Sequence, residues 1–95
     1  MFGELLFKSK VWQNTLIDFA KARNIQAPGV EFHCIDGASH KIATLVPLKS
    51  CLVAAVYTAP SMTNVRFFAY DSIKDIELKE EPPETQFKGI GHIRK

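Results

Sequence analysis

Apolar and polar positions follow a helical period in the first third of the chain. Within residues 10–23 the large apolar side chains recur at positions i, i+4, i+7 and i+8, which places them on one helix face. They are Trp12, Leu16, Phe19 and Ala20. Ser9 is placed to cap the first turn, and Asn24, followed by the Pro-Gly pair at 28–29, is placed to end the helix. We therefore predict a helix over residues 10–23 whose apolar face covers a sheet, preceded by an extra helical turn or a loose arm at residues 1–8.

Beyond residue 29 the pattern changes to five short runs typical of β-strands. They cover residues 30–34, 39–46, 51–57, 65–70 and 73–78, and a turn of residues 59–64 separates the third run from the fourth. Asp36-Gly37 predicts a tight hairpin between the first two, and Pro47, which has no amide hydrogen to donate, should end the second. The third run does not alternate, and the fourth has Phe67 on one face and Phe68 on the other. We expect both strands to be covered on both faces.

The length and composition are those of one small globular domain. The 95 residues have a mass of 10.7 kDa; 46% are hydrophobic and 23% are charged. These values exclude a wholly disordered chain, a collagen-like chain and a disulfide scaffold. Residues 79–84 are charged and proline-rich, which is typical of a linker. We expect the domain to span residues 1–79 and a tail, which docks or stays free, to span residues 80–95.

The cysteines and the N-terminus indicate an intracellular protein. Cys34 and Cys51 are the only cysteines, and such a pair in a chain without a signal peptide indicates free thiols in a reducing compartment. The first apolar run, Leu5-Leu6-Phe7, is too short for the core of a signal peptide. The longest uncharged run, residues 50–64, contains Ser, Thr, Pro and Asn and falls short of a membrane span. We expect a soluble, cytoplasmic protein that has no membrane partner.

Three groups of residues resemble the Sm/LSm family of small SH3-like barrels, including its bacterial Hfq-type members. The helix at 10–23 enters the first strand through the 28–29 turn, and residues 30–37, VEFHCIDG, are similar to the family's first strand and its glycine hairpin. Residues 67–77, FFAYDSIKDIE, are similar to its fourth strand, single-turn corner and fifth strand. The resemblance covers about residues 9–79. It implies a mainly β fold, in which an N-terminal α-helix precedes a five-stranded antiparallel SH3-like (Sm-like) small barrel.

The resemblance also implies a ring. In the Sm arrangement the fourth strand of one copy pairs with the fifth strand of the next, and such head-to-tail contacts close into a ring. A five-stranded open barrel has two free edges, which is an independent reason to expect assembly. We expect a homo-oligomer of about five to seven copies, by analogy with the family's rings.

The residues that hold a base in the family are not carried over to this chain. The turn between the second and third strands, residues 47–50, lacks the family's Asp and Asn. At the corner before the fifth strand, Tyr70-Asp71-Ser72 stands in place of the family's Arg-Gly or Lys-His pair. Nucleic-acid binding is therefore implied by analogy of fold rather than by signature residues.

The sequence contains no residue set that predicts catalysis or a cofactor. His33 and Cys34 are neighbours on a strand and point to opposite faces, so they cannot act together as base and nucleophile; Cys34 is interpreted as a small core residue. No pair of cysteines or histidines has the C-x₂₋₄-C or H-x₃₋₅-H spacing of a zinc site, so no metal is predicted. The acids of residues 71–84 are interpreted as a solvated surface. We do not expect an enzyme.

The middle of the chain is the only segment whose charge has one sign. Twelve basic and ten acidic residues give a net charge of +2, but residues 38–70 contain three cations and no acid. Lys49 lies in the turn between the second and third strands and Tyr70 precedes the corner, and these two connections meet at one end of such a barrel. A cation beside an aromatic ring can bind single-stranded nucleic acid, because it neutralises phosphate while the ring stacks on a base. The candidate nucleic-acid-binding residues are Lys49, Tyr70, Lys41, Arg66 and Ser72.

Two functions remain open at this point. The first is a homo-oligomeric ring that binds single-stranded RNA or DNA. The second is a structural or adaptor ring that recognises proteins through its helix or its tail, which accounts for the missing signature residues and the small net charge. Alternatives also remain open for the candidate residues themselves: Tyr70 packs in the subunit contact while the lysines are solvated, and Arg66 forms a salt bridge between subunits with an acid such as Asp75.

Overall fold

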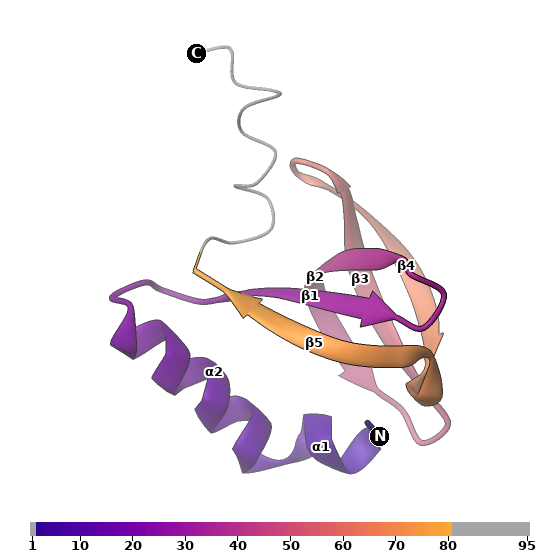
Figure 1. The fold of residues 1–95 in the computed structure, drawn as a ribbon, viewed down its shortest axis with the longest axis horizontal. Helices are drawn as coiled ribbons and strands as arrows, with labels where there is room; N and C mark the ends of the chain where they lie inside the picture. The colour runs from indigo at the N-terminus through magenta and orange to yellow at the C-terminus, as the bar shows by residue number, and fades with distance from the viewer. Residues whose placement is uncertain (1, 81–95) are drawn as a thin grey trace.

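The chain folds as a short helical segment followed by five strands, as a computed structural model of the protein shows for residues 2–80 (Figure 1). The helices and strands are α1 (Glu4–Lys8), α2 (Lys10–Ala22), β1 (Gly29–Cys34), β2 (Ser39–Pro47), β3 (Cys51–Ala59), β4 (Met62–Ala69) and β5 (Ile73–Lys79), with one 3₁₀ turn, η1 (Tyr70–Ser72), before β5. The expected tail lies outside the described residues from position 81 onward.

The helical prediction is confirmed, with the end of the helix one residue earlier than expected. Ser9 caps α2, because its Oγ accepts a hydrogen bond from the Trp12 amide at 3.3 Å. After α2 ends, Asn24 has a φ of 57°, the left-handed conformation that turns the chain away from the helix axis. Of the two alternatives for residues 1–8, α1 is the extra helical turn, and Ser9 separates it from α2.

All five strands belong to one antiparallel sheet in the order β4-β3-β2-β1-β5, so the expected mainly β class is confirmed. Among residues 2–80, β4 pairs only with β3, and β5 pairs only with β1. The sheet is therefore not closed by hydrogen bonds between β4 and β5, and within this part of the chain both strands are free edges.

The sheet curls around a core of aromatic and aliphatic side chains on its inner face. Phe32 of β1 and Phe68 of β4 come from strands that are not neighbours, yet their rings meet edge to face with centroids 5.5 Å apart. Phe7 of α1 is buried and packs its ring on Phe32 and Trp12. The buried core consists of Phe7, Phe32, Cys34, Ile42, Leu52, Ala54, Val56, Phe68 and Ile73.

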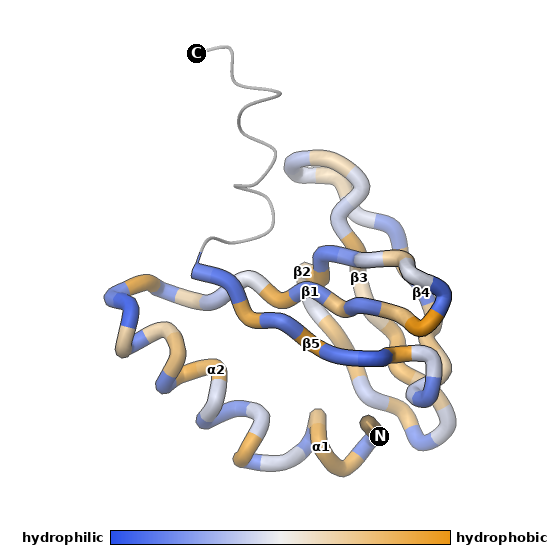
Figure 2. The backbone as a smooth tube through the Cα atoms, in the orientation of Figure 1, coloured by the Kyte–Doolittle hydropathy of each residue, from blue (hydrophilic) through white to orange (hydrophobic). Residues whose placement is uncertain are grey.

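The outer faces of β3 and β4 are less covered than we expected from the sequence. Burial alternates along β3, because its even-numbered residues 52–56 face the core while Val53 and Ala55 are half-buried on the other face. On β4, Phe68 is buried, whereas Val65 and Phe67 are 66% and 70% exposed. The expectation of cover on both faces is wrong for the described chain, because the helical segment packs against the inner side through Phe7. The interleaving of polar and apolar residues, which matches one covered face per strand, is visible along β1 and β5 in Figure 2.

Two of the expected turns have different lengths in the structure. The β1–β2 hairpin is confirmed, but its loop spans residues 35–38. Gly37 in this loop adopts a positive φ of 92°, and the Cys34 amide donates to the Ala38 carbonyl. The longer turn expected at 59–64 is wrong, because residues 62–64 continue the ladder with β3 and leave only two residues between the strands. The ladder hydrogen bonds outweigh the weak strand preference of Asn64.

Helix α2 lies beside β2 and does not seal against it. Trp12 and Leu16 face Ile42 and Leu45 across a groove of about 420 Å³. Trp12 is half-buried, so the expected apolar face is correct but covers the sheet only in part. In residues 2–80, neither helix has the length and apolar character needed to cross a membrane.

Candidate functional site

The β2–β3 turn and the corner before β5 meet, as the strand order predicts. The Tyr70 hydroxyl of η1 donates a 2.5 Å hydrogen bond to the Leu48 carbonyl, next to Lys49. This bond brings Tyr70 and the turn of Lys49 together, as we expected from the sequence. Lys49 is exposed, and no acidic group of the described chain lies within salt-bridge distance of it.

The Tyr70 ring is not free to stack on a base from both sides, because it packs against other residues of the chain. Its ring lies nearly parallel to that of Phe7, at 24° and with centroids 6.2 Å apart, and it packs against the core. Burial and the nearby charge of Glu4 raise the pKa of Tyr70, so its hydroxyl stays a donor for Leu48. Tyr70 therefore holds α1, the corner and the turn together, and one face of its ring is already occupied.

Arg66 and Ser72 lie away from the β2–β3 turn and line an open pocket of about 310 Å³ between the β1–β2 loop and β4. His40 lies in the same pocket, with its ring edge to face on Phe68 at 5.3 Å, and Arg66 approaches the same phenyl ring at 5.9 Å. Burial and the charge of Arg66 lower the pKa of His40, so the imidazole is predominantly neutral near pH 7. The Ser72 hydroxyl donates to the Ala69 carbonyl and lies at the pocket wall.

The charge in this pocket is mixed. Asp36 also lines it, with Oδ1 accepting a hydrogen bond from the Ala38 amide at 2.9 Å. Arg66 forms no salt bridge among the described residues, so its guanidinium is available to an anion. Phe67 also borders the pocket, but it alternates with Arg66 and Phe68 along β4, so its exposed ring lies on the outer face of the strand. The edge strand β4 thus carries a guanidinium on its inner face and an exposed aromatic ring on its outer face, and cations and aromatic rings are the groups that bind single-stranded nucleic acid.

Lys41 lies apart from the other candidate residues. It faces Glu31 across the β1–β2 ladder, and its charge lowers the pKa of that carboxyl. Glu31 alternates with the buried Phe32 on β1, so Lys41 belongs to the outer face of the sheet, whereas Arg66 pairs with the buried Ala54 on the inner face. The structure therefore does not bring Lys41 to the pocket of Arg66.

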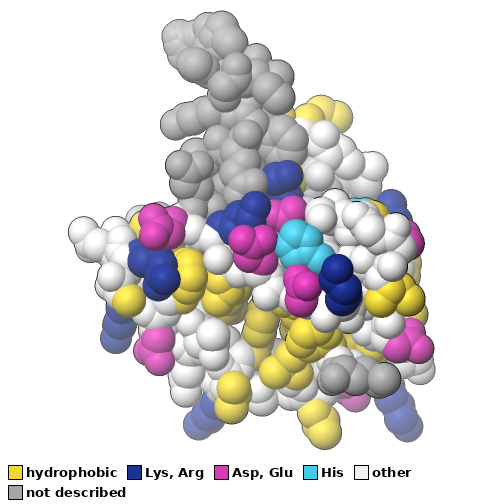
Figure 3. Space-filling view, in the orientation of Figure 1, with side chains coloured by type: hydrophobic (Ala, Val, Ile, Leu, Met, Phe, Trp, Pro, Cys, Tyr) yellow, Lys and Arg dark blue, Asp and Glu magenta, His cyan; other side chains and the backbone are white. Residues whose placement is uncertain are grey.

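The outer face of β1 and β5 carries a network of charged side chains, which gathers in the centre of Figure 3. Lys79 Nζ lies 2.6 Å from Glu31 Oε1. Burial alone would raise the pKa of Glu31, but the hydrogen bond and charge of Lys79 outweigh it and hold that pKa below its usual range. The same hydrogen bond raises the pKa of Lys79. Both groups are ionised near neutral pH.

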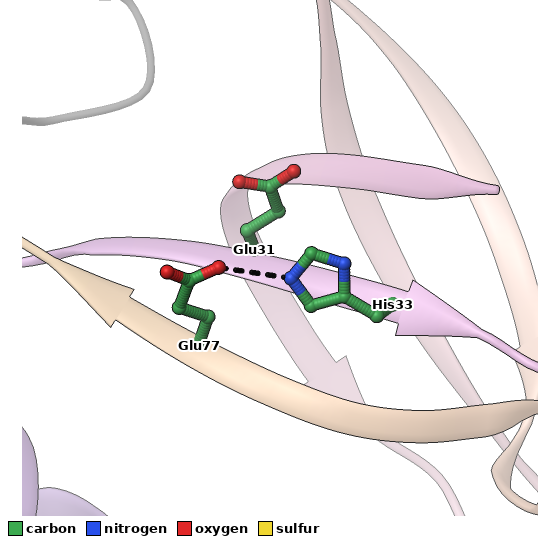
Figure 4. A group of neighbouring side chains, drawn as sticks. All are labelled: Glu31, His33 and Glu77. Atoms are coloured by element: carbon green, nitrogen blue, oxygen red, sulfur yellow. Dashed lines mark hydrogen bonds and ion pairs between the residues drawn. The ribbon is translucent and has the colours of Figure 1, made fainter. Parts of the chain in front are cut away.

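His33 sits in the middle of this network. Its Nε2 lies 3.0 Å from Glu77 Oε1 (Figure 4). Its Nδ1 lies 2.9 Å from Ser39 Oγ. Glu31, His33 and Glu77 each offer a ligand atom, and the three atoms lie within 4.8 Å of one another. The spacing of ligands in the sequence could not reveal this group, because Glu77 comes from a strand 44 positions after His33.

Of the two cysteines, Cys34 is a core residue, as the sequence predicts. Cys34 is buried, and burial raises the pKa of its thiol, so it is a poor nucleophile. His33 points to the opposite face of β1, as alternation along a strand requires. Cys51 is a half-buried free thiol.

Sequence reasoning missed Phe67 and His40 as members of the pocket. The apolar side chain of Phe67 on an edge strand was a usable signal, but only the exposure of its ring shows that nothing in the described chain covers it. Comparisons with protein-family models, curated proteins and solved structures found no match for this chain.

Proposed function

We propose that this protein is the subunit of a homo-oligomeric, Sm-like small-barrel ring that binds single-stranded RNA or DNA. The observation that carries the proposal is the pocket at β4 in which Arg66, which forms no salt bridge among the described residues, lies with His40 at the Phe68 ring, while Phe67 presents an exposed ring on the other face of the same strand. Arg66 would neutralise a phosphate in the pocket, and Phe67 would stack on a base on the outer face of β4. His40 and Ser72 add polar groups that can bond to a base edge or a sugar.

The strand order supports assembly. β4 and β5 are free edges of the same sheet, which is what head-to-tail pairing between copies requires. β4 also carries the exposed apolar side chains of Met62 and Val65, which an adjoining copy would cover. A ring multiplies the small net charge and places several copies of the pocket on one particle.

The exposed apolar side chains also favour the second candidate, an adaptor ring. Val46, Val53 and Phe67 lie opposite one another on β2, β3 and β4, and form an apolar strip on the outer face. Such a strip fits a protein partner better than a polyanion. We rank this function second because the strip has no charged or polar anchor.

The test is a fluorescence-anisotropy titration of labelled oligo(U) and oligo(dT) at two salt concentrations. The unmodified protein should bind, and Arg66→Ala should weaken binding to both and reduce the salt slope by about one, because one phosphate contact is lost. Phe67→Ala should weaken the free energy of binding by ~1–3 kcal/mol per stacked base and leave the salt slope unchanged. Lys49→Ala should also weaken binding and reduce the salt slope, because a bound nucleic-acid strand that continues over the β2–β3 turn contacts Lys49 through a phosphate.

The matched control is Arg23→Ala. Arg23 carries the same charge, but its guanidinium lies over the Phe19 ring at 3.9 Å and pairs with Glu80 at 3.5 Å. Its removal should leave affinity within error. Absence of binding to either oligonucleotide at low salt would reject the nucleic-acid function and leave the adaptor function.

A further inference from the structure

We propose that the outer face of β1 and β5 is a binding site for a divalent transition-metal ion, with zinc as the occupant, held by His33, Glu77 and Glu31 of one chain. The proposal is independent of nucleic-acid binding, because the pocket of Arg66 opens on the other face of the sheet. It needs no second copy, because all three ligands belong to the same subunit.

The ladder between the two strands brings the three ligands together. Glu31 and His33 are two positions apart on β1 and therefore share a face, and Glu77 lies directly opposite Glu31 on β5. The backbone of two hydrogen-bonded strands thus fixes the starting points of all three side chains. This is a more rigid support than a loop would offer.

The distances suit a small ion. In a tetrahedral zinc site with metal–ligand bonds of ~2.0–2.2 Å, neighbouring ligand atoms lie ~3.3–3.5 Å apart. His33 Nε2 and Glu77 Oε1 are 3.0 Å apart, so this pair needs little change. The Glu31 carboxylate lies within 4.8 Å of the other two ligand atoms and reaches the ion by a rotation of its side chain. Three protein ligands leave a fourth position for water or an outside ligand.

The second nitrogen of His33 is already held by a neighbouring strand. Nδ1 lies 2.9 Å from Ser39 Oγ of β2. When Nδ1–H donates to this hydroxyl, the lone pair of Nε2 faces the carboxylates, which is the tautomer that a metal requires. Ser39 would therefore orient the imidazole of His33 toward the metal ion.

The charges around the site favour a cation. Asp75 Oδ1, 3.9 Å from His33 Nε2, adds a third carboxylate to those of Glu31 and Glu77. Lys79 and Lys41 are the two ammonium groups that face Glu31, so the acids exceed the bases by one. The Glu31 side chain is nine-tenths buried, and Lys79 is the group now closest to its Oε1. Lys79 is therefore a competitor of the ion, and a mixed imidazole and carboxylate set favours zinc over magnesium or calcium.

Calorimetric titration of the full chain with zinc chloride tests the site. We expect one zinc ion per chain and a melting temperature that rises with zinc. His33→Gln and Glu77→Gln should each weaken zinc binding by about tenfold or more, and Lys79→Gln should strengthen it, because the competing ammonium is gone. Circular dichroism shows whether each variant is folded before it is titrated.

Two controls separate this site from other zinc ligands. Asp18→Asn removes one negative charge from α2, as Glu77→Gln does from β5, and should leave zinc affinity unchanged. Cys51→Ser removes the half-buried thiol and should also bind as the unmodified chain does. A chain that shows no saturable zinc binding, or one whose affinity is unchanged in His33→Gln, would overturn the proposal. Unchanged affinity in Lys79→Gln would overturn the assignment of Glu31 as a ligand.

Discussion

At the scale of single residues, internal partners decide which aromatic side chain can meet a ligand. Tyr70 and Phe67 are three positions apart, and both are aromatic residues near a cation. Tyr70 is held by the Leu48 carbonyl and by the Phe7 ring, whereas the Phe67 ring is 70% exposed. The structure therefore favours a structural role for Tyr70 and leaves base stacking to Phe67 in our proposal.

This division of roles predicts opposite effects of two substitutions. Tyr70→Phe keeps the ring and removes only the hydrogen bond to Leu48, so the free energy of unfolding in urea should fall by about 1 kcal/mol while nucleic-acid affinity stays unchanged. Phe67→Ala should change the free energy of unfolding by no more than about 0.5 kcal/mol, because the ring is exposed. Equal stability of Tyr70→Phe and the unmodified protein would show that the bond to Leu48 contributes nothing.

At the scale of elements, the junction between α1 and α2 determines where the aromatic cluster forms. Ser9 leaves the helical conformation, with φ −82° and ψ 159°, and its hydroxyl donates to the Leu6 carbonyl at 2.7 Å while accepting from Trp12. One side chain thus ends the first helix and starts the second. The bend places the rings of Phe7 and Trp12 5.1 Å apart, and Phe7 packs on Phe32.

Ser9→Ala should destabilise this junction. Because both hydrogen bonds of the hydroxyl are lost, the free energy of unfolding should fall by about 0.5–2 kcal/mol. Chemical denaturation followed by the fluorescence of Trp12 measures the change. Ser50→Ala, at an exposed position of the β2–β3 turn, is the matched control and should be neutral. If both variants unfold at the same denaturant concentration, the capping role of Ser9 is wrong.

At the scale of the whole molecule, the outer face of the sheet is divided into two kinds of surface. Over β1 and β5 it carries carboxylates, lysines and His33. Over β2, β3 and β4 it carries apolar side chains, of which Val46, Val65 and Phe67 are exposed and Val53 is half-buried. The apolar half ends at the free edge of β4 and the charged half at the free edge of β5. In the proposed ring these two unlike edges meet, so the contact is head to tail and one substitution on β4 affects every interface.

The ring predicts that Val65→Lys disrupts assembly. Light scattering of the unmodified protein should give a mass several times 10.7 kDa. A lysine on an edge strand opposes pairing with another strand, and Val65 is 66% exposed in the single chain, so this variant should fold and have the mass of a monomer. Ile17→Lys, at a 50% exposed position on α2, should keep the assembly. A monomeric unmodified protein would reject the ring.

The sequence by itself determined the order and type of the elements. The spacing of Trp12, Leu16 and Phe19, the cap at Ser9 and the stop at Pro47 are local signals, since each depends on residues that are neighbours along one helix or strand. The convergence of Lys49 and Tyr70 also followed from the chain order, because consecutive antiparallel strands place alternate connections at the same end.

Only the tertiary structure decided which side chains are covered and which groups share a site. Burial of Phe68 and exposure of Phe67 depend on how far the sheet curls and on where Phe7 packs, which no local pattern specifies. The cluster of Glu31, His33 and Glu77 exists because β5 pairs with β1, although the two strands are far apart in the sequence. The register of this pairing determines which residues lie opposite each other. The periodicity along one strand shows which residues share a face, but it does not show which strand lies beside it. Contacts across the sheet are therefore known only from the fold.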